Sequence, residues 1–265
     1  HPFEGRFYHR ETSYETLGFD HMTFLEGMAH TSKIDNDPYV SDYSVVEEIL
    51  DKLRASEEPM LLNVVTMQNH SPFAGKYDDP VEATLRDGEP VPEEFAHYLA
   101  GLRHADAALG RLHRELKQLS EDTVVLFYGD HLPPGWPHVT ELDAVERLEV
   151  PYVIFANTPL PKTSKPTTPI GATQLLGQLV TSAGGQVTPL QVFLSDQLDI
   201  LPAITPAGVY DGQRIADLAA VDDDVQDMVH QFQVLQYAML TDPEVARTMV
   251  TIPEDSPAEY SATGH

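Results

Sequence analysis

An aspartate and a histidine follow each other directly at the end of a predicted strand. The apolar run Val124–Tyr128 is rich in β-branched and aromatic residues, which is typical of a buried strand. It is followed by Gly129, Asp130 and His131, and then by two prolines and a glycine through which no strand continues. Ligands bind at the carboxyl ends of strands in open α/β sheets, and a carboxylate beside an imidazole suits a divalent metal ion. The alternative is a turn in which Asp130 caps backbone amides and His131 is exposed.

A second polar loop of this kind follows a second predicted strand. The segment Met60–Met67 is mostly apolar, as the strands of parallel sheets are, and it ends in Gln68, Asn69 and His70. Two such loops after neighbouring parallel strands would meet at one edge of the sheet. The alternative is a turn built on asparagine and proline, in which His70 has no function.

The first 26 residues form a third candidate region, rich in Arg, His and aromatic side chains. A loop of this composition can hold an anion, because a guanidinium group such as that of Arg10 pairs bidentately with phosphate. The alternative is a surface loop whose aromatic rings pack on the domain. The pattern from Arg10 to Leu17 predicts a short helix that is closed by Gly18.

Charge and composition exclude several classes of partner. The chain has 265 residues, with 16 Lys and Arg against 42 Asp and Glu, so its formal net charge is −26. Contacts to nucleic acid and to anionic lipid surfaces need clustered Lys and Arg, which argues against both. An anionic substrate must therefore be held by a metal ion or by a few arginines. The absence of cysteine excludes disulfides and thiolate metal sites, and no apolar run approaches the ~20 residues of a membrane span.

The remaining periodicity predicts an alternation of helices and strands. A helix between Met60–Met67 and Val124–Tyr128 predicts a β-α-β unit and hence parallel pairing of these strands. On that helix we expect His97 to lie at the surface. Further predicted elements are helices over Asp42–Ala55, Glu93–Leu119, Thr140–Arg147, Ile170–Ala183, Leu190–Ile200 and Asp222–Leu240, a strand over Val150–Ala156, a hairpin over Val209–Ile215 and a polar tail over Thr251–His265. We expect one catalytic domain with its core in about residues 1–160, a helical and hairpin portion in about residues 170–245, and a tail over 251–265.

Several motifs in this order resemble one known family. They are His1-Pro2, Phe7-Tyr8-His9-Arg10, Leu17-Gly18-Phe19-Asp20, Met67–Phe73, Tyr128–Pro133 and Gln233–Tyr237. Their order and spacing resemble the extracellular catalytic domain of lipoteichoic-acid synthase-like phosphoglycerol transferases, in the sulfatase-like branch of the alkaline phosphatase superfamily. The resemblance implies an α/β fold, a three-layer α/β/α sandwich with a mixed, mostly parallel sheet, of which the N-terminal portion is missing here.

The resemblance also implies roles for individual residues. Asp130 and His131 would be metal ligands, and the metal in this family is usually manganese, with magnesium or zinc as variants. His70, in the turn that begins with Asn69, would touch the substrate. Arg10 would hold the phosphoglycerol head group. Tyr8 and Asn69 would also contact the substrate, and Tyr8 stands where the family usually has Trp.

One part of the family pattern is missing from the chain. The family's nucleophile is a threonine at a helix N-terminus, and a further metal-binding carboxylate lies upstream of it; both precede the motif that ends in Arg10. Only nine residues precede Arg10, and the chain begins at His1 rather than Met. We therefore expect a piece of a longer protein whose nucleophile and membrane helices lie upstream. We expect this chain alone to be inactive, to bind metal weakly and to self-associate through exposed apolar surface.

The predicted function is a metal-dependent phosphoglycerol transferase at the extracellular face of a bacterial cytoplasmic membrane. The metal would polarise the phosphoryl group, and an enzyme-linked phosphoglycerol would form and then pass to an acceptor. The partner would be an anionic lipid head group or a glycerol-phosphate polymer. Two alternatives remain open: a sulfatase or phosphodiester hydrolase of the same fold, and a non-catalytic binding module.

Overall fold

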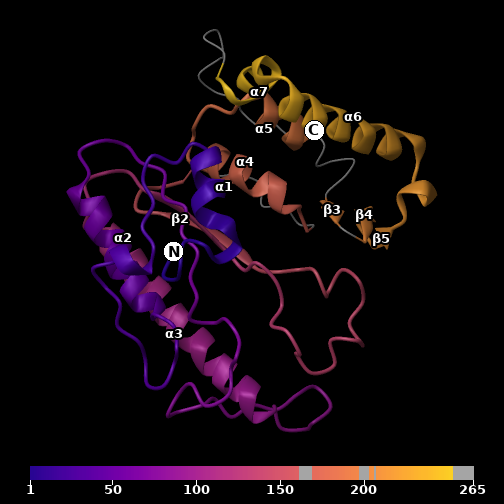
Figure 1. The fold of residues 1–265 in the computed structure, drawn as a ribbon. Coiled ribbons are helices and arrows are strands. Elements are labelled where there is room, and N and C mark those ends of the chain that lie inside the picture. Colours follow the sequence, from indigo (N-terminus) through magenta and orange to yellow (C-terminus); the bar gives the residue numbers. More distant parts are fainter. Residues whose placement is uncertain (161–168, 197–202, 206, 253–265) are drawn as a thin grey trace. The chain divides into compact units, whose positions relative to one another are not determined.

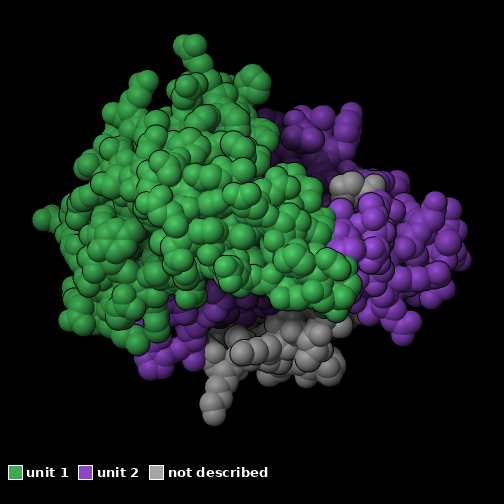
Figure 2. All heavy atoms as spheres, turned by 90° about the horizontal axis from the view of Figure 1, so that it is seen from below, with its two compact units in different colours: residues 1–122, 133–137 green, residues 123–132, 138–265 purple. Residues whose placement is uncertain are grey.

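The computed structural model describes residues 1–160, 169–196, 203–205 and 207–252. The chain divides into two compact units, which Figure 2 shows in different colours. Unit 1 comprises residues 1–122 and 133–137, and unit 2 comprises residues 123–132 and 138–265. Each unit has its own secondary structure and is treated separately below.

Two packed helices form the centre of unit 1. Helix α2 (Asp42–Ala55) lies against α3 (Glu93–Leu116), as Figure 1 shows. The side chain of Ser41 accepts a hydrogen bond from the amide of Ser44 and thereby caps the first turn of α2. Each helix buries an apolar stripe: Val45, Val46 and Leu50 on α2, and Phe95, Ala108, Leu112 and Leu116 on α3. Phe95, near the start of α3, packs on the rings of Phe73 and Trp136. The predicted bounds of α2 are confirmed, and α3 ends three residues before the predicted end.

The N-terminal segment of unit 1 consists of short helices. The 3-10 helix η1 (Phe7–His9) leads into α1 (Arg10–Thr16), and a further 3-10 turn, η2, covers Leu25–Gly27. The predicted short helix is therefore confirmed. Gly18, just after α1, has a φ of 83°, a left-handed conformation that favours glycine and ends the helix.

Three predictions that involve unit 1 are wrong. Met60–Met67 is not a strand: in the described part of the chain it forms no ladder, and Leu61 is 66% exposed. An apolar run indicates burial but cannot supply the neighbouring strand that a ladder needs, so the predicted parallel pairing with Val124–Tyr128 is also wrong. His97 is buried and not at the surface, and its Nδ1 accepts a hydrogen bond from the amide of Tyr77 at 3.2 Å.

Unit 2 contains the two central strands that the sequence predicts. They are β1 (Val124–Tyr128) and β2 (Tyr152–Ala156), and they pair antiparallel, with Val124 opposite Ala156. The predicted hairpin is confirmed as β4 (Gly208–Tyr210) and β5 (Ile215–Ala216), where the carboxylate of Asp211 accepts from the amides of the turn. A short strand, β3 (Ala203–Thr205), pairs with β4.

Four α-helices and one 3-10 helix complete the described part of unit 2. The α-helices are α4 (Ala172–Ser182), α5 (Pro189–Asp196), α6 (Asp223–Thr241) and α7 (Pro243–Val250), in that order, and the 3-10 helix is η3 (Leu218–Ala220). The first three confirm predicted helices. The fourth was not predicted, and the predicted helix over Thr140–Arg147 is a series of turns. The end of the predicted helix Leu190–Ile200 and most of the predicted tail lie outside the described residues. No helix among the described residues is long and apolar enough to cross a membrane.

Candidate functional site

The backbone before Arg10 has an unusual conformation. Tyr8 and His9 both have a φ of 54°, in the left-handed region that residues other than glycine seldom occupy. Such residues are concentrated at binding and active sites. These two left-handed residues set the position of Arg10. Its guanidinium carbon lies 5.9 Å from the centre of the Tyr8 ring, and its Nη1 donates to the Tyr14 hydroxyl at 2.8 Å.

The loop that carries Tyr8 contacts the loop that carries His70. The ring of Phe7 lies 4.5 Å from that of Tyr8 and 6.2 Å from that of His70, both edge to face. Arg10, Tyr8, Phe7 and His70 thus form a continuous chain of contacts within unit 1. Tyr8 is 72% exposed and His70 is also exposed, so both side chains can reach a ligand.

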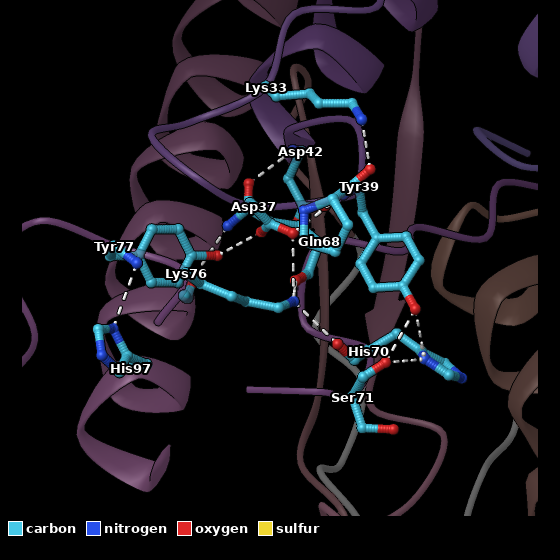
Figure 3. A network of polar contacts seen from close by, with 12 residues as sticks. Lys33, Asp37, Tyr39, Asp42, Gln68, His70, Ser71, Lys76, Tyr77 and His97 are labelled. Carbon is cyan, nitrogen blue, oxygen red and sulfur yellow. Dashed lines mark hydrogen bonds and ion pairs between the residues drawn. The ribbon is translucent and has the colours of Figure 1, made fainter. Parts of the chain in front are cut away.

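The backbone that carries His70 is fixed by a buried lysine. The ammonium group of Lys76 lies 3.2 Å from a carboxylate oxygen of Asp37 and donates to the carbonyls of Gln68 and His70 at 2.7 and 2.8 Å, as Figure 3 shows. The side chains of both charged residues are almost completely buried, at 3% and 1% exposed. Burial lowers the pKa of Lys76, and the Asp37 carboxylate opposes that shift.

Further polar groups complete this network. The Tyr77 hydroxyl donates to Asp37 at 2.8 Å, and burial together with this carboxylate raises the pKa of Tyr77. Gln68 accepts from the amide of Asp42 and donates to the carbonyl of Gly101, which ties the turn to α2 and α3. Asp42 itself is buried, and its desolvation raises the pKa of this carboxyl to about 6.

Asn69 points toward the protein interior. Its Oδ1 is buried and has no hydrogen-bond partner among the described residues. A Cβ added at Gly101 would lie 2.2 Å from this oxygen, so α3 approaches the turn closely at a residue without a side chain. This geometry gives Asn69 a packing role in the turn; its predicted contact with substrate stays a prediction.

Asp130 and His131 lie together in unit 2, just after β1. Oδ2 of Asp130 is 3.4 Å from Nε2 of His131, and the two side chains are 81% and 67% exposed. The other carboxylate oxygen accepts from the amide of His131 at 2.9 Å. Nδ1 of His131 lies 2.7 Å from the carbonyl of Leu132, which can only accept, so Nδ1 carries hydrogen and the lone pair of the neutral ring is on Nε2.

This pair of donor atoms fits a divalent metal ion. Two ligands at ~2.1 Å from a tetrahedral metal lie about 3.4 Å apart. Metal-binding histidines usually donate their other ring N–H to a carbonyl or carboxylate, as His131 does to Leu132. Within the described ranges no group of three or more His, Asp or Glu residues could hold a metal. The assignment of Asp130 and His131 as metal ligands stays a prediction.

The structure thus brings some of the predicted site residues together. Arg10, Tyr8, Asn69 and His70 belong to unit 1, and the first two are linked to His70 through Phe7. Asp130 and His131 belong to unit 2, so their predicted convergence with Arg10 and His70 stays a prediction.

Sequence reasoning missed the residues that hold the turn: Asp37, Tyr39, Gln68 and Lys76. One weak signal was present, because Lys76 lies close to His70 at the start of a loop that is mostly acidic. A sequence does not reveal that a lysine is buried when its carboxylate partner lies far earlier in the chain.

Comparison with known proteins decides the family. The sulfatase family model matches residues 1–184, which is more than half of the chain. The chain belongs to the sulfatase family. The fold agrees, since Streptococcus pyogenes phosphoglycerol transferase GacH, solved in complex with sn-glycerol-1-phosphate, matches with a TM-score of 0.73 over 96% of this chain and 64% of that chain, at 22% identity. The predicted α/β class is thereby confirmed.

Three curated bacterial proteins are similar to this chain in sequence. A Rhizobium meliloti protein named for cyclic β-1,2-glucan modification is 32% identical over 139 residues, 51% of this chain and 21% of its own length. The capsular polysaccharide biosynthesis protein RkpI of the same organism is 31% identical over 50% of this chain and 23% of its own length. Lipoteichoic acid synthase of Staphylococcus saprophyticus is 26% identical over 47% and 19%.

The chain spans about a fifth of the length of these curated relatives. The resemblance to lipoteichoic-acid synthase-like proteins of the sulfatase family, inferred from the motifs, is confirmed. This sulfatase-family chain is similar in fold to one phosphoglycerol transferase and in sequence to the three bacterial proteins named above.

Proposed function

We propose that this chain is part of the catalytic domain of a metal-dependent phosphoglycerol transferase. The enzyme acts at the extracellular face of the bacterial cytoplasmic membrane, takes a phosphoglycerol group from an anionic lipid and passes it to an envelope glycan or glycerol-phosphate polymer. The reaction runs through a covalent intermediate on a threonine upstream of residue 1. The names of the three sequence relatives and of the structural neighbour support this class of donor and acceptor.

The observation that carries the proposal is the contact between the two substrate-binding loops. Arg10 and His70 come from separate segments, and the rings of Tyr8 and Phe7 connect them. The positive guanidinium of Arg10 holds the phosphate in a protein whose net charge of −26 otherwise repels anions. The exposed ring of Tyr8 offers a flat apolar face to the glycerol carbons.

Asp130 and His131 would hold the metal ion, together with ligands outside the residues described. When bound, the ion offsets charge on the phosphoryl group and lowers the pKa of the attacking hydroxyl. The chain's own part is to present Nε2 of His131 and Oδ2 of Asp130 side by side, which the hydrogen bonds to Leu132 and to the amide of His131 achieve.

The test uses the full-length protein with a phosphoglycerol lipid as donor. We expect transfer of glycerol phosphate to a glycan acceptor, loss of activity in a chelator, and recovery with manganese. Asp130→Asn and His131→Gln should each abolish turnover, whereas Asp143→Asn, an exposed aspartate of the same unit, should not. Release of free glycerol phosphate at the same rate with and without acceptor would identify a hydrolase instead, and no turnover under any condition would favour a binding module. We expect residues 1–265 alone to show no turnover.

A further inference from the structure

The hydrogen bonds of His70 determine which nitrogen of its ring faces the ligand. Nδ1 lies 2.7 Å from the carbonyl oxygen of Ser71 and 3.2 Å from the hydroxyl of Tyr39. A carbonyl oxygen can only accept a hydrogen bond, so Nδ1 must carry hydrogen at this distance. The neutral ring therefore has its lone pair on Nε2.

Tyr39 reinforces this arrangement. Its hydroxyl donates to the same Ser71 carbonyl at 2.8 Å, which leaves its oxygen lone pairs directed at His70. Figure 3 shows the Tyr39 hydroxyl, the Ser71 carbonyl and Nδ1 of His70 at the corners of one small triangle. The Tyr39 ring is held in turn by Lys76, whose ammonium group lies 4.8 Å from its centre, and by the ring of Phe3 at 6.0 Å.

Lys76 fixes the backbone of His70. It donates to the carbonyl of His70, whereas Tyr39 binds the ring, so backbone and side chain of His70 are each held by a separate group. Both holding residues come from segments outside the turn itself. The imidazole is thus oriented before any ligand arrives, which is what positioning groups achieve in metal sites and catalytic triads.

We infer that Tyr39 is a positioning residue that holds His70 in the Nδ1–H tautomer, so that Nε2 accepts a hydrogen bond from a hydroxyl group of the substrate. The inference deepens the proposed function and rests on it for the identity of the substrate. A neutral imidazole in this tautomer cannot donate to a phosphate oxygen, which leaves the phosphate to Arg10. The chemical group that suits Nε2 is an alcohol, either of the glycerol head or of the incoming acceptor.

The direct test is the nitrogen spectrum of His70. Long-range ¹H–¹⁵N correlation on the protein, assigned with His70→Gln, separates the two tautomers by the shifts of Nδ1 and Nε2. At a pH where the ring is neutral we expect the Nδ1–H pattern in the unmutated protein. A predominant Nε2–H pattern would overturn the inference, and this measurement needs no activity and no variant of Tyr39.

The second arm removes the hydroxyl alone. Tyr39→Phe keeps the ring that packs on Lys76 and Phe3 but removes one of the two acceptors near Nδ1–H. We therefore expect the ¹⁵N shifts of His70 to move part of the way toward the average of the two tautomers, because the Ser71 carbonyl still favours Nδ1–H. In the full-length enzyme kcat should fall about fivefold, as the loss of one hydrogen bond implies, with KM little changed. The control is Tyr43→Phe, which removes an exposed hydroxyl on α2 and should change neither quantity.

The outcomes separate this inference from the proposed function. Shifted ¹⁵N resonances in Tyr39→Phe without any transferase activity in the full-length protein would keep the positioning role and refute the function. Transferase activity in the full-length protein, with unchanged His70 resonances and unchanged kcat in Tyr39→Phe, would keep the proposed function and refute the positioning role of Tyr39.

Discussion

Replacing Lys76 by methionine tests the buried network most directly. The substitution keeps the length of the side chain but removes the ion pair with Asp37 at 3.2 Å and the hydrogen bonds to the carbonyls of Gln68 and His70. Breaking a buried ion pair on one side costs about 3–5 kcal/mol, because the remaining charge stays buried without its partner. Asp37 keeps two donors, the amide of Tyr39 and the hydroxyl of Tyr77. We therefore expect a loss at the lower end, about 3 kcal/mol.

Urea unfolding followed by circular dichroism measures this loss as a lower midpoint at an unchanged slope. Lys33→Met is the matched control, because Lys33 is exposed and donates to a single carbonyl, that of Pro38, so its loss should cost less than about 1 kcal/mol. Adding Asp37→Asn to Lys76→Met should recover at least about 1 kcal/mol, since it removes the unpaired charge. A loss below about 1 kcal/mol in Lys76→Met would refute the reasoning, as would a double variant no more stable than the single one.

Three further predictions concern neighbouring groups. Burial raises the pKa of Asp42 from 3.8 to about 6, so the folded state holds the carboxyl proton more tightly than the unfolded state does. The stability that this proton contributes is present below about pH 4 and falls by about 3 kcal/mol as the pH rises through 6. Asp42→Asn should remove that fall, and a difference between variant and unmutated protein that stays constant from pH 4 to 7 would contradict the assignment. Gly101→Ala should destabilise the protein by about 1–3 kcal/mol, because the added Cβ would lie 2.2 Å from Asn69 Oδ1. In the control Gly110→Ala, on the same helix, the added Cβ meets only the end of the Arg114 side chain at 3.4 Å, so this variant should be more stable by up to about 1 kcal/mol. Equal midpoint shifts of the two variants in thermal unfolding would argue against the close approach at Gly101. Arg10→Lys should lower kcat/KM of the full-length enzyme at least about tenfold, because the point charge of an ammonium group does not replace the planar, bidentate guanidinium. The control Arg6→Lys, at an exposed position, should have little effect. Equal activities of the two variants would show that Arg10 is not part of the site.

The parts of the fold that local pattern determines could be predicted from the sequence. The bounds of α2 follow from one apolar face and a serine cap, and the β4–β5 hairpin follows from Asp-Gly between apolar flanks. Pairing could not be predicted in the same way. Val124–Tyr128 and Tyr152–Ala156 are strands as expected, but their antiparallel partnership depends on the path of the chain between them.

The residues of the candidate site likewise differ in whether local sequence pattern indicates them. Arg10, His70, Asp130 and His131 are predicted site residues because residue type and motif order single them out, and their roles stay predictions. The groups that orient them were not found, since a buried lysine or a tyrosine hydroxyl becomes informative only when its partner is known. Tyr39 reaches His70 from a loop 31 residues earlier, and no local pattern indicates that contact.

Position 8 is subject to two opposed demands on the choice of amino acid. Its φ of 54° is best met by glycine, asparagine or aspartate, and a β-branched residue would be strongly disfavoured there. Its contacts with the Phe7 ring and the Arg10 guanidinium require an aromatic ring. In a saturation library, selection for folding and selection for activity should therefore enrich different residues at this position. His9 has the same backbone conformation but no ring contact within the part of the chain that the structure describes, so both selections should accept glycine there.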